Sequence, residues 1–183
     1  MKKVKSTLIY FFCIAFLISC NNKSHETEKA VSHFMGQSII LPKTSKTLYR
    51  DSLYKKQLLR KEPKLKITTL LWGDCHSCIK DLKEWEDFYQ YSNTKENIEI
   101  MFYLFTSDLD FFRENLYTEN IYNFPLIIDQ KNNYMVKNDI PFNKKLFQTF
   151  LLDSNNRVIL VGNPIYSDKL MKLYKEEINK RLD

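Results

Sequence analysis

Two cysteines, Cys75 and Cys78, are the side chains of this sequence best suited to do chemistry, because they lie three positions apart with a histidine and a serine between them. Thiols at this spacing exchange with other disulfides or supply two of the four ligands of a zinc site. A structural disulfide is the weaker interpretation, because closing so short a loop removes little entropy from the unfolded chain. The pattern therefore indicates redox chemistry first and metal binding second.

The N-terminus predicts export from the cytoplasm. Three lysines among the first five residues precede an apolar run from Leu8 to Ile18. This run is shorter than the roughly 20 residues that span a bilayer and has the length of a signal-peptide core. It ends in Leu17-Ile18-Ser19-Cys20, which resembles the lipobox of bacterial lipoproteins. The resemblance implies that residues 1–19 are removed and that Cys20 is lipidated; a plain secretory signal or a short hydrophobic anchor is the alternative.

The segments after this signal predict a tethered domain in the cell envelope. Residues 20–37 are polar and are expected to form a tether. Residues 38–183 have the length of one domain. Asn21, directly after the lipidated cysteine, lacks the acidic signal that retains some lipoproteins in the inner membrane. We therefore expect a membrane anchor through Cys20 that faces the periplasm, with the outer membrane favoured.

The charge of the chain argues against nucleic acid as a partner. The whole sequence has 28 basic and 22 acidic side chains and a net charge of +6. Without the three lysines of residues 1–19 the counts become 25 and 22, a net charge of +3. So small an excess, with no basic stripe interleaved with aromatic residues, does not indicate a nucleic-acid groove.

Hydrophobic patterning predicts an α/β domain with a central mixed β-sheet flanked by helices and an N-terminal strand or hairpin added to it. Strands are expected at 38–41, 65–72, 98–105 and 124–128, and in a hairpin of 147–153 and 157–161. Helices are expected at 51–61, 75–91, 108–116 and 166–182. In the last helix the inward-facing residues are expected to be Leu170, Leu173, Tyr174 and Ile178.

The place of the cysteines in this pattern predicts how the two thiols differ. Gly73-Asp74 forms the turn after a buried strand, and Cys75 opens a helix. The first N–H groups of a helix lack internal partners and carry partial positive charge. A thiolate there is stabilised, so the pKa of Cys75 is expected to lie below the free value of about 8.5. Cys75 is therefore expected to be the attacking thiolate and Cys78 to resolve the mixed disulfide.

Four neighbours are expected to modulate the pair: Trp72, Asp74, His76 and Ser77. His76 would add positive charge when it is protonated. The carboxylate of Asp74 would raise the pKa of the thiol unless it caps the helix. Trp72 is expected to pack at the rim of the site.

The order of strand, Trp72-Gly73-Asp74-Cys75-His76-Ser77-Cys78 and amphipathic helix resembles the thioredoxin superfamily, and most of all the exported TlpA-type thiol-disulfide oxidoreductases. The stretch from Phe150 to Val158 resembles the β-hairpin that follows the substrate-binding loop of that family, and Gly162 and the C-terminal helix are similar too. The resemblance covers residues 38–182. It implies a thioredoxin-like fold and an oxidoreductase, preferably a disulfide reductase, whose partner is a protein disulfide or a redox protein.

Two features depart from that family. The family places a cis-proline directly before the strand of the hairpin, where this chain has Phe147-Gln148-Thr149, and Pro141 is the nearest candidate. Either a short insertion separates Pro141 from the strand, or the cis-proline is lost and with it the usual grip on a peptide substrate. The strand at 65–72 also lacks the buried acid that assists proton transfer in thioredoxin.

Other classes of function fit parts of the pattern. The displaced proline favours a non-catalytic binding module with a structural disulfide, and two thiols suit a soft metal ion such as Cu(I). Zinc would need two further ligands, and His25, His33 and His76 lie in the tether or within the motif. Three glycines in the whole chain leave no phosphate-binding loop. We therefore expect neither a metal nor an organic cofactor.

Overall fold

The computed structural model describes residues 27–43, 46–50, 52–55, 62–121, 124–142 and 144–182. The chain divides into two compact units, Met1–Phe34 and Met35–Asp183. In the first unit residues 27–34 form a helix, within the segment expected to be a tether. The expected signal peptide and Cys20 lie outside the described residues. The second unit carries the β-sheet and the pair Cys75 and Cys78.

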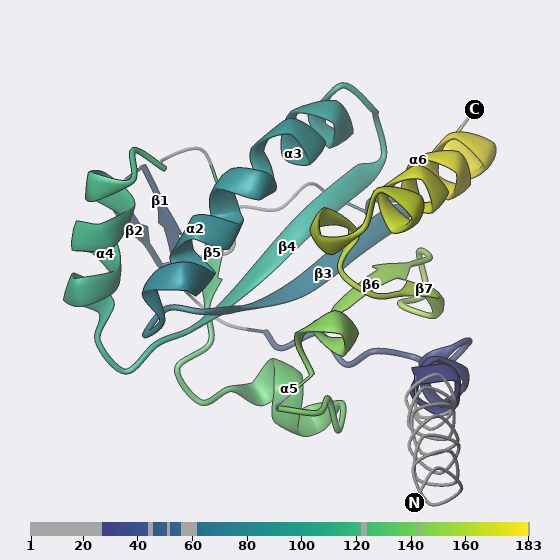
Figure 1. The fold of residues 1–183 in the computed structure, drawn as a ribbon, viewed down its shortest axis with the longest axis horizontal. Coiled ribbons are helices and arrows are strands. Elements are labelled where there is room, and N and C mark those ends of the chain that lie inside the picture. The colour runs from purple at the N-terminus through teal and green to yellow at the C-terminus, as the bar shows by residue number, and fades with distance from the viewer. Residues whose placement is uncertain are drawn as a thin grey trace, which may run out of the picture. The chain divides into compact units, whose positions relative to one another are not determined.

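The second unit contains both strands and helices, mixed along the chain (Figure 1). The strands are β1 (Thr47–Tyr49), β2 (Ser52–Tyr54), β3 (Leu65–Trp72), β4 (Ile98–Phe105), β5 (Leu126–Ile128), β6 (Thr149–Leu152) and β7 (Val158–Val161). The helices are α2 (His76–Glu84), α3 (Glu86–Asn93), α4 (Leu109–Thr118), α5 (Asn133–Lys137) and α6 (Asp168–Leu182), with 3₁₀ turns η1 (Lys145–Gln148) and η2 (Pro164–Tyr166). Among the described residues these strands form one mixed sheet in the order β2-β1-β5-β4-β3-β6-β7. Strands β3, β4 and β5 run parallel, and the others pair antiparallel with their neighbours.

The central strands β3 and β4 are covered on both faces. Successive side chains of a strand point to opposite faces of the sheet. On one face Phe102 packs edge-to-face on Trp85, between α2 and α3, with 5.4 Å between ring centroids. On the other face the next residue, Tyr103, stacks on Tyr134 of α5 at 4.5 Å. This double burial explains why β3 and β4 are mainly apolar rather than alternating between apolar and polar residues.

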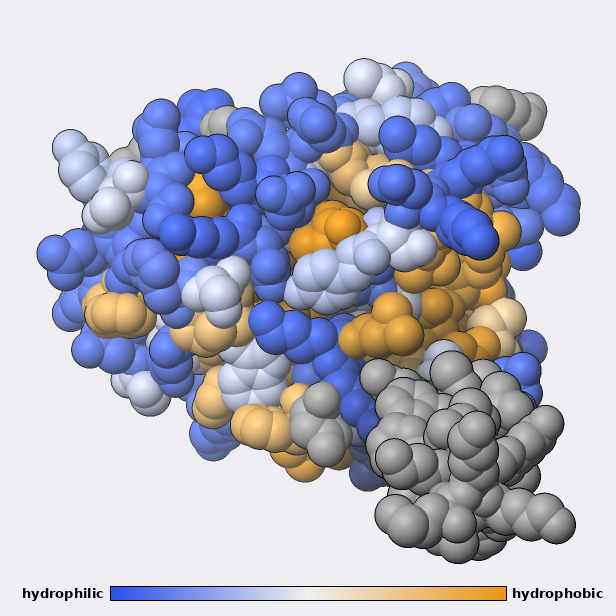
Figure 2. Space-filling view, viewed as in Figure 1, coloured by the Kyte–Doolittle hydropathy of each residue, from blue (hydrophilic) through white to orange (hydrophobic). Residues whose placement is uncertain are grey.

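The helices on the α2 side are amphipathic. Ile79 and Leu82 of α2, together with Tyr174 and Ile178 of α6, are fully buried in the main hydrophobic core. Figure 1 shows α2 and α3 lying in front of β4, with α6 beside them. In Figure 2 the outward surface over these helices is mainly hydrophilic. One face of each helix therefore seals the core and the opposite face meets solvent.

Most of the expected elements are confirmed. β3 and β4 have the bounds that their apolar runs predict, and the β6–β7 hairpin turns where a turn is expected. Helix α4 begins after Asp108, whose carboxylate accepts a hydrogen bond from the backbone N–H of Phe111 at 2.9 Å. This is an N-cap, and it explains why the helix starts at this point.

The helix expected at 75–91 is divided into α2 and α3 at Trp85. There the backbone N–H of Trp85 bonds to the carbonyl of Leu82, one residue closer than in an α-helix, at 3.2 Å. The side chain of Trp85 is buried against Phe88 and Phe102. Core packing of this large ring accompanies the break. In α6, Leu173 was expected to face inward but is 41% exposed, because Tyr174 and Ile178 take the buried stripe.

The segments before β3 differ from the prediction. The strand expected at 38–41 is a single bridge from Ser38 to Arg157, beside the start of β7. The prediction of a helix at 51–61 is wrong for those of its residues that the structure describes in a strand, because Ser52–Tyr54 form β2. It pairs with β1, and Arg50 reverses the chain between them in a left-handed conformation (φ 46°). Pairing of β1 with β5 buries Leu48 in the core, so long-range contacts override the local preference for helix.

The packing of Phe102 predicts a large loss of stability when its ring is removed. Phe102→Ala should lower the free energy of unfolding by about 3–5 kcal/mol, because a fully buried ring leaves a cavity among Trp85, Tyr89 and Phe124. Urea unfolding measures this. Phe111→Ala is the matched control, since Phe111 is 41% exposed and should cost only about 0.5 kcal/mol. Similar losses for both variants would contradict the described core.

Candidate functional site

The junction between β3 and α2 places the two cysteines. Trp72 ends β3, Gly73 and Asp74 turn the chain, and Cys75 is the residue that caps α2. The sulfur atoms of Cys75 and Cys78 are at disulfide-bonding distance, and their Cα atoms are 5.2 Å apart. Cys75 is partly exposed, whereas Cys78, one turn further along the helix, is 5% exposed. One sulfur therefore faces solvent at a helix N-terminus and the other lies beneath it.

Ser77 provides a hydroxyl beside the exposed sulfur. Its Oγ lies 3.1 Å from Sγ of Cys75. In the reduced protein a hydroxyl at that place donates a hydrogen bond to a thiolate, and such a bond favours the charged form. The N-terminus of α2 acts in the same direction. Sequence reasoning named Ser77 only as a modulating residue, and the structure supplies the contact.

His76 turns away from the disulfide toward α4. Its Nδ1 lies 2.7 Å from Oδ1 of Asn115, and its Nε2 lies 3.6 Å from the carboxylate of Glu119. The same carboxylate pairs with Lys80 at 3.7 Å. Positive charge on a protonated His76 would therefore be offset by an acid that the sequence pattern did not place there.

Asp74 does not cap α2. Its carboxylate accepts hydrogen bonds from the hydroxyl of Thr106 at 2.5 Å and from the backbone N–H of Ser107 at 2.9 Å. Burial acts to raise the pKa of Asp74, but these hydrogen bonds outweigh it and hold the pKa below its usual value. Asp74 therefore stays ionised at neutral pH and ties the turn before Cys75 to the loop between β4 and α4.

Trp72 lies at the rim among aromatic rings. Its ring centroid is 5.2 Å from that of Phe105 and 4.7 Å from that of Phe142, both in edge-to-face geometry. Its indole N–H donates to Oε1 of Gln148 at 3.3 Å. Phe142 is 66% exposed, so this group presents apolar surface to solvent next to the turn that carries Cys75.

Pro141 is not a cis-proline. Among the described residues no peptide bond is cis, so Pro141 is an ordinary loop proline. The residue directly before β6 is Gln148, at the end of the 3₁₀ turn η1. Its buried amide donates to the carbonyl of Phe142 at 3.0 Å while accepting from Trp72. The side-chain amide of Gln148 therefore closes this loop, at the position where the resembled family has a proline.

A cluster of polar side chains that sequence reasoning missed lies beside Cys78. A cavity of about 20 Å³, room for about one water molecule, is lined by Cys78, Asp81, Lys145 and Tyr166 among others. The carboxylate of Asp81 accepts from the hydroxyl of Tyr166 at 2.6 Å and pairs with Lys145 at 3.4 Å. Burial raises the pKa of Tyr166 and this hydrogen bond raises it further, so Tyr166 remains a donor. The three-residue spacing from Cys78 to Asp81 is the one sequence signal for this cluster.

The described residues give two findings on metals and membranes. No group of three or more His, Cys, Asp or Glu side chains is arranged there to hold a metal ion. None of the helices in that part of the chain has the length and apolar character needed to cross a membrane.

Solved structures share this arrangement of sheet, helices and turn. A domain of a possible thiol-disulfide isomerase from Cytophaga hutchinsonii is 14% identical over 80% of this chain and 96% of that chain, with a TM-score of 0.54. A candidate thiol:disulfide interchange protein DsbE from Chlorobium tepidum is 13% identical over 81% and 99%, with a TM-score of 0.55. The chain has a thioredoxin-like fold. The fold class expected from the sequence is thereby confirmed.

Other comparisons define how far this likeness reaches. The exposed lipoprotein thioredoxin Etrx1 from Streptococcus pneumoniae matches the thioredoxin-like fold at 10% identity, over 72% of this chain and 97% of that chain, with a TM-score of 0.50. No protein-family profile and no curated relative matches the sequence. At identities this low the likeness establishes the fold, and function rests on the site.

The contact between Ser77 and Cys75 predicts a change in thiol acidity. Ser77→Ala should raise the pKa of Cys75 in the reduced protein by roughly one unit, because the thiolate loses a hydrogen-bond donor. The ultraviolet absorbance of the thiolate, followed against pH, measures this. Ser154→Ala, in the exposed turn between β6 and β7, is the control and should leave the titration unchanged. An unaltered pKa in Ser77→Ala would show that the hydroxyl does not reach the thiolate.

Proposed function

We propose that this protein is a thiol-disulfide oxidoreductase of the bacterial cell envelope, with Cys75 as the nucleophile and Cys78 as the resolving thiol. The observation that carries the proposal is the asymmetry of the pair. Cys75 is partly exposed at the N-terminus of α2, whereas Cys78 is buried and at disulfide-bonding distance from it. A purely structural disulfide needs no accessible sulfur at a positively polarised helix end.

The exchange proceeds in two displacements. The thiolate of Cys75 attacks one sulfur of a substrate disulfide, and the other substrate sulfur leaves as a thiolate that takes up a proton from water. Cys78 then loses its proton and attacks Sγ of Cys75. The mixed disulfide breaks, and the second substrate sulfur leaves as a thiolate. The substrate gains two electrons, Cys75 and Cys78 form a disulfide, and a thiol reductant must reduce this pair before the next cycle.

The surface beside the pair supports a protein as the partner. Phe142 and Trp72 form an exposed aromatic edge next to the turn that carries Cys75. Apolar surface of this kind suits a disulfide carried on a polypeptide better than a small polar disulfide. We place reduction of a protein disulfide ahead of oxidation, on the resemblance to the TlpA-type proteins.

The proposal includes a lipid anchor. Removal of residues 1–19, lipidation of Cys20 and a tether through residue 37 would leave residues 38–183 as the working domain in the periplasm. One structural neighbour is named as an exposed lipoprotein thioredoxin, and another is named as DsbE. These names support an envelope location, and the outer membrane remains our preference because of Asn21.

A binding module without catalysis is the second candidate. Gln148 stands directly before β6, and the Ile140–Pro141 bond is trans. The loop that grips peptide substrates in the resembled family is therefore built differently here. A module of this kind would keep the disulfide between Cys75 and Cys78 closed and would not turn over.

The two cysteines predict different outcomes when each is replaced. Cys75→Ser should abolish reduction of a protein disulfide such as that of insulin, because no sulfur attacks the substrate. Cys78→Ser should slow turnover strongly and accumulate a mixed disulfide on Cys75, because the resolving thiol is missing. Turbidity of reduced insulin measures the first result, and intact-mass spectrometry measures the second.

The double variant, Cys75→Ser with Cys78→Ser, is the blank and should neither turn over nor trap substrate. The binding module would be supported if the wild-type protein did not reduce insulin and if its disulfide resisted mild thiol reductants. Full activity in both single variants would contradict the proposed roles outright.

A further inference from the structure

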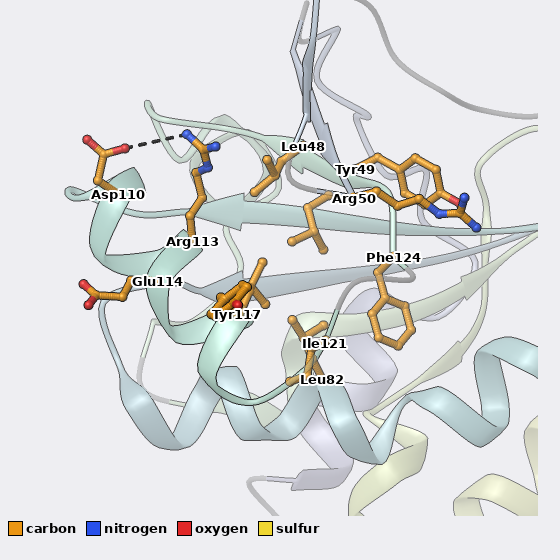
Figure 3. A pocket seen from close by; sticks show the side chains of 12 residues that line it. Leu48, Tyr49, Arg50, Leu82, Asp110, Arg113, Glu114, Tyr117, Ile121 and Phe124 are labelled. Carbon is orange, nitrogen blue, oxygen red and sulfur yellow. Dashed lines mark ion pairs between the residues drawn. The ribbon is translucent and has the colours of Figure 1, made fainter.

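Helices α2 and α4 pack against each other beside the redox motif. Both contribute apolar side chains to the wall of one cavity, Leu82 from α2 and Leu116 from α4 (Figure 3). At the N-terminal end of α2 the two helices are joined by polar side chains instead, and one of them is His76. His76 lies between the two cysteines in the sequence, so a contact that holds it can influence the cysteine pair.

This polar α2–α4 contact is built from two pairs of residues at helical spacing. His76 and Lys80 lie four positions apart on α2, and Asn115 and Glu119 lie four positions apart on α4 and its C-terminal cap. Residues at this spacing share one face of a helix. Nδ1 of His76 lies 2.7 Å from Oδ1 of Asn115. The carboxylate of Glu119 lies 3.6 Å from Nε2 of His76 and 3.7 Å from Nζ of Lys80.

The amide of Asn115 is fixed in its orientation by α4 itself. Its Nδ2 donates to the carbonyl of Phe111, four residues earlier, at 2.8 Å. The amide oxygen is therefore the atom turned toward His76, and an amide oxygen can only accept a hydrogen bond. Nδ1 of His76 must then carry the proton, because the hydrogen bond on one ring nitrogen decides which nitrogen is protonated. Nε2, on the side of Glu119, is left as the nitrogen that gains and loses a proton.

The same contact keeps the imidazole away from the exposed sulfur. Among the described residues no hydrogen bond or ion pair joins His76 to Cys75, whose sulfur lies 3.1 Å from the hydroxyl of Ser77. A protonated imidazole beside a thiolate stabilises it, and stabilisation of the reduced form makes a cysteine pair more oxidising. Because α4 holds the ring elsewhere, the dithiol lacks this stabilisation and is the stronger reductant.

The hydrogen bond to Asn115 is the specific element of the α2–α4 contact. The side chains of His76 and Lys80 are 55% and 57% exposed, and ion pairs of such exposed groups contribute little and are screened by salt. The carboxylate of Glu119 is also shared between these two cations. Asn115 is uncharged, and its bond to Phe111 fixes the acceptor in place. The position of the ring therefore depends most on Asn115.

We propose that Asn115 is a positioning residue, which holds His76 on α4 and thereby favours reduction of a partner by the Cys75–Cys78 pair. The inference rests on the proposed disulfide exchange and deepens it, because it gives the direction of electron flow a cause in contacts of this chain. Without the hydrogen bond the imidazole is free to turn toward Cys75, the preceding residue.

The protonation site of the ring tests the contact in the unaltered protein. At alkaline pH, where histidine is neutral, His76 of the wild-type protein should carry its proton on Nδ1. Proton–nitrogen correlation NMR of isotope-labelled protein shows which nitrogen is protonated, and His76→Ala identifies the signals. In Asn115→Leu, a change of similar shape, the proton should move to Nε2, the site that prevails in unconstrained histidine. A wild-type ring with its proton on Nε2 would overturn the proposal.

The redox equilibrium tests the consequence for the cysteines. In this equilibrium the protein disulfide and two glutathione thiols exchange for the protein dithiol and glutathione disulfide. Asn115→Leu should shift it roughly threefold to tenfold toward the dithiol, which raises the potential by about 15–30 mV. In a His76→Ala background the same substitution should change it by less than about twofold, because Asn115 acts only through the ring. Glu114→Gln, on the same helix, is the control and should have no effect.

Three results of the redox measurement would overturn the proposal: no shift in Asn115→Leu, a shift toward the disulfide, or equal shifts with and without His76. If Asn115→Leu fails to fold by circular dichroism, the protonation site in the wild-type protein decides. Neither readout needs substrate turnover. A chain that never reduces insulin but shows both effects would lose the proposed function and keep the role of Asn115, whereas an active chain without these effects would lose that role alone.

Discussion

The junction between β3 and α2 depends on a close approach that only glycine permits, because a Cβ at Gly73 would lie 2.7 Å from the Cβ of Thr106. The backbone N–H of Gly73 bonds to the carbonyl of Phe105 at 2.8 Å, extending the β3–β4 pairing by one residue. Asp74 then holds Thr106 and the backbone that follows it. The direction in which the chain enters α2 is therefore fixed by β4, and with it the exposed position of Cys75. Larger side chains at residue 73 would displace the cysteine pair from the sheet.

Once this junction is fixed, the charges and dipoles that act on the thiol of Cys75 come from a few nearby groups. Its favourable contributions come from the N-terminus of α2 and the hydroxyl of Ser77 at 3.1 Å. His76 is engaged with α4, and its neighbour Glu119 is itself shared with Lys80, so one carboxylate offsets only part of the positive charge of this cluster when the histidine is charged. Asp74 keeps its negative charge at neutral pH because it is hydrogen-bonded to the β4–α4 loop. The balance of these few groups, rather than the net charge of the chain, sets the acidity of the thiol.

The parts of the fold that follow from sequence are those with strong local patterns. The apolar runs at 65–72 and 98–105 predict β3 and β4 with their bounds, since parallel central strands are buried on both faces. The residues that form the expected N-terminal hairpin, β1 and β2, escape prediction because pairing of β1 with β5, far along the chain, decides their position. In the site, the cysteine spacing identifies Cys75 and Cys78, whereas Gln148 reaches Trp72 only through the folded loop. No local sequence pattern can predict this contact, because the two residues are far apart in the sequence.

The reduction potential of the Cys75–Cys78 pair tests the central claim most directly. Equilibration of the protein with glutathione buffers of stepped ratio, followed by thiol alkylation and mass measurement, gives the value. A working oxidoreductase should have a potential between about −120 and −270 mV, the range of known thiol-disulfide exchange proteins. A value well below about −300 mV would mean a disulfide that stays closed in the cell envelope. That result would contradict the account and leave the thioredoxin-like domain as a binding module.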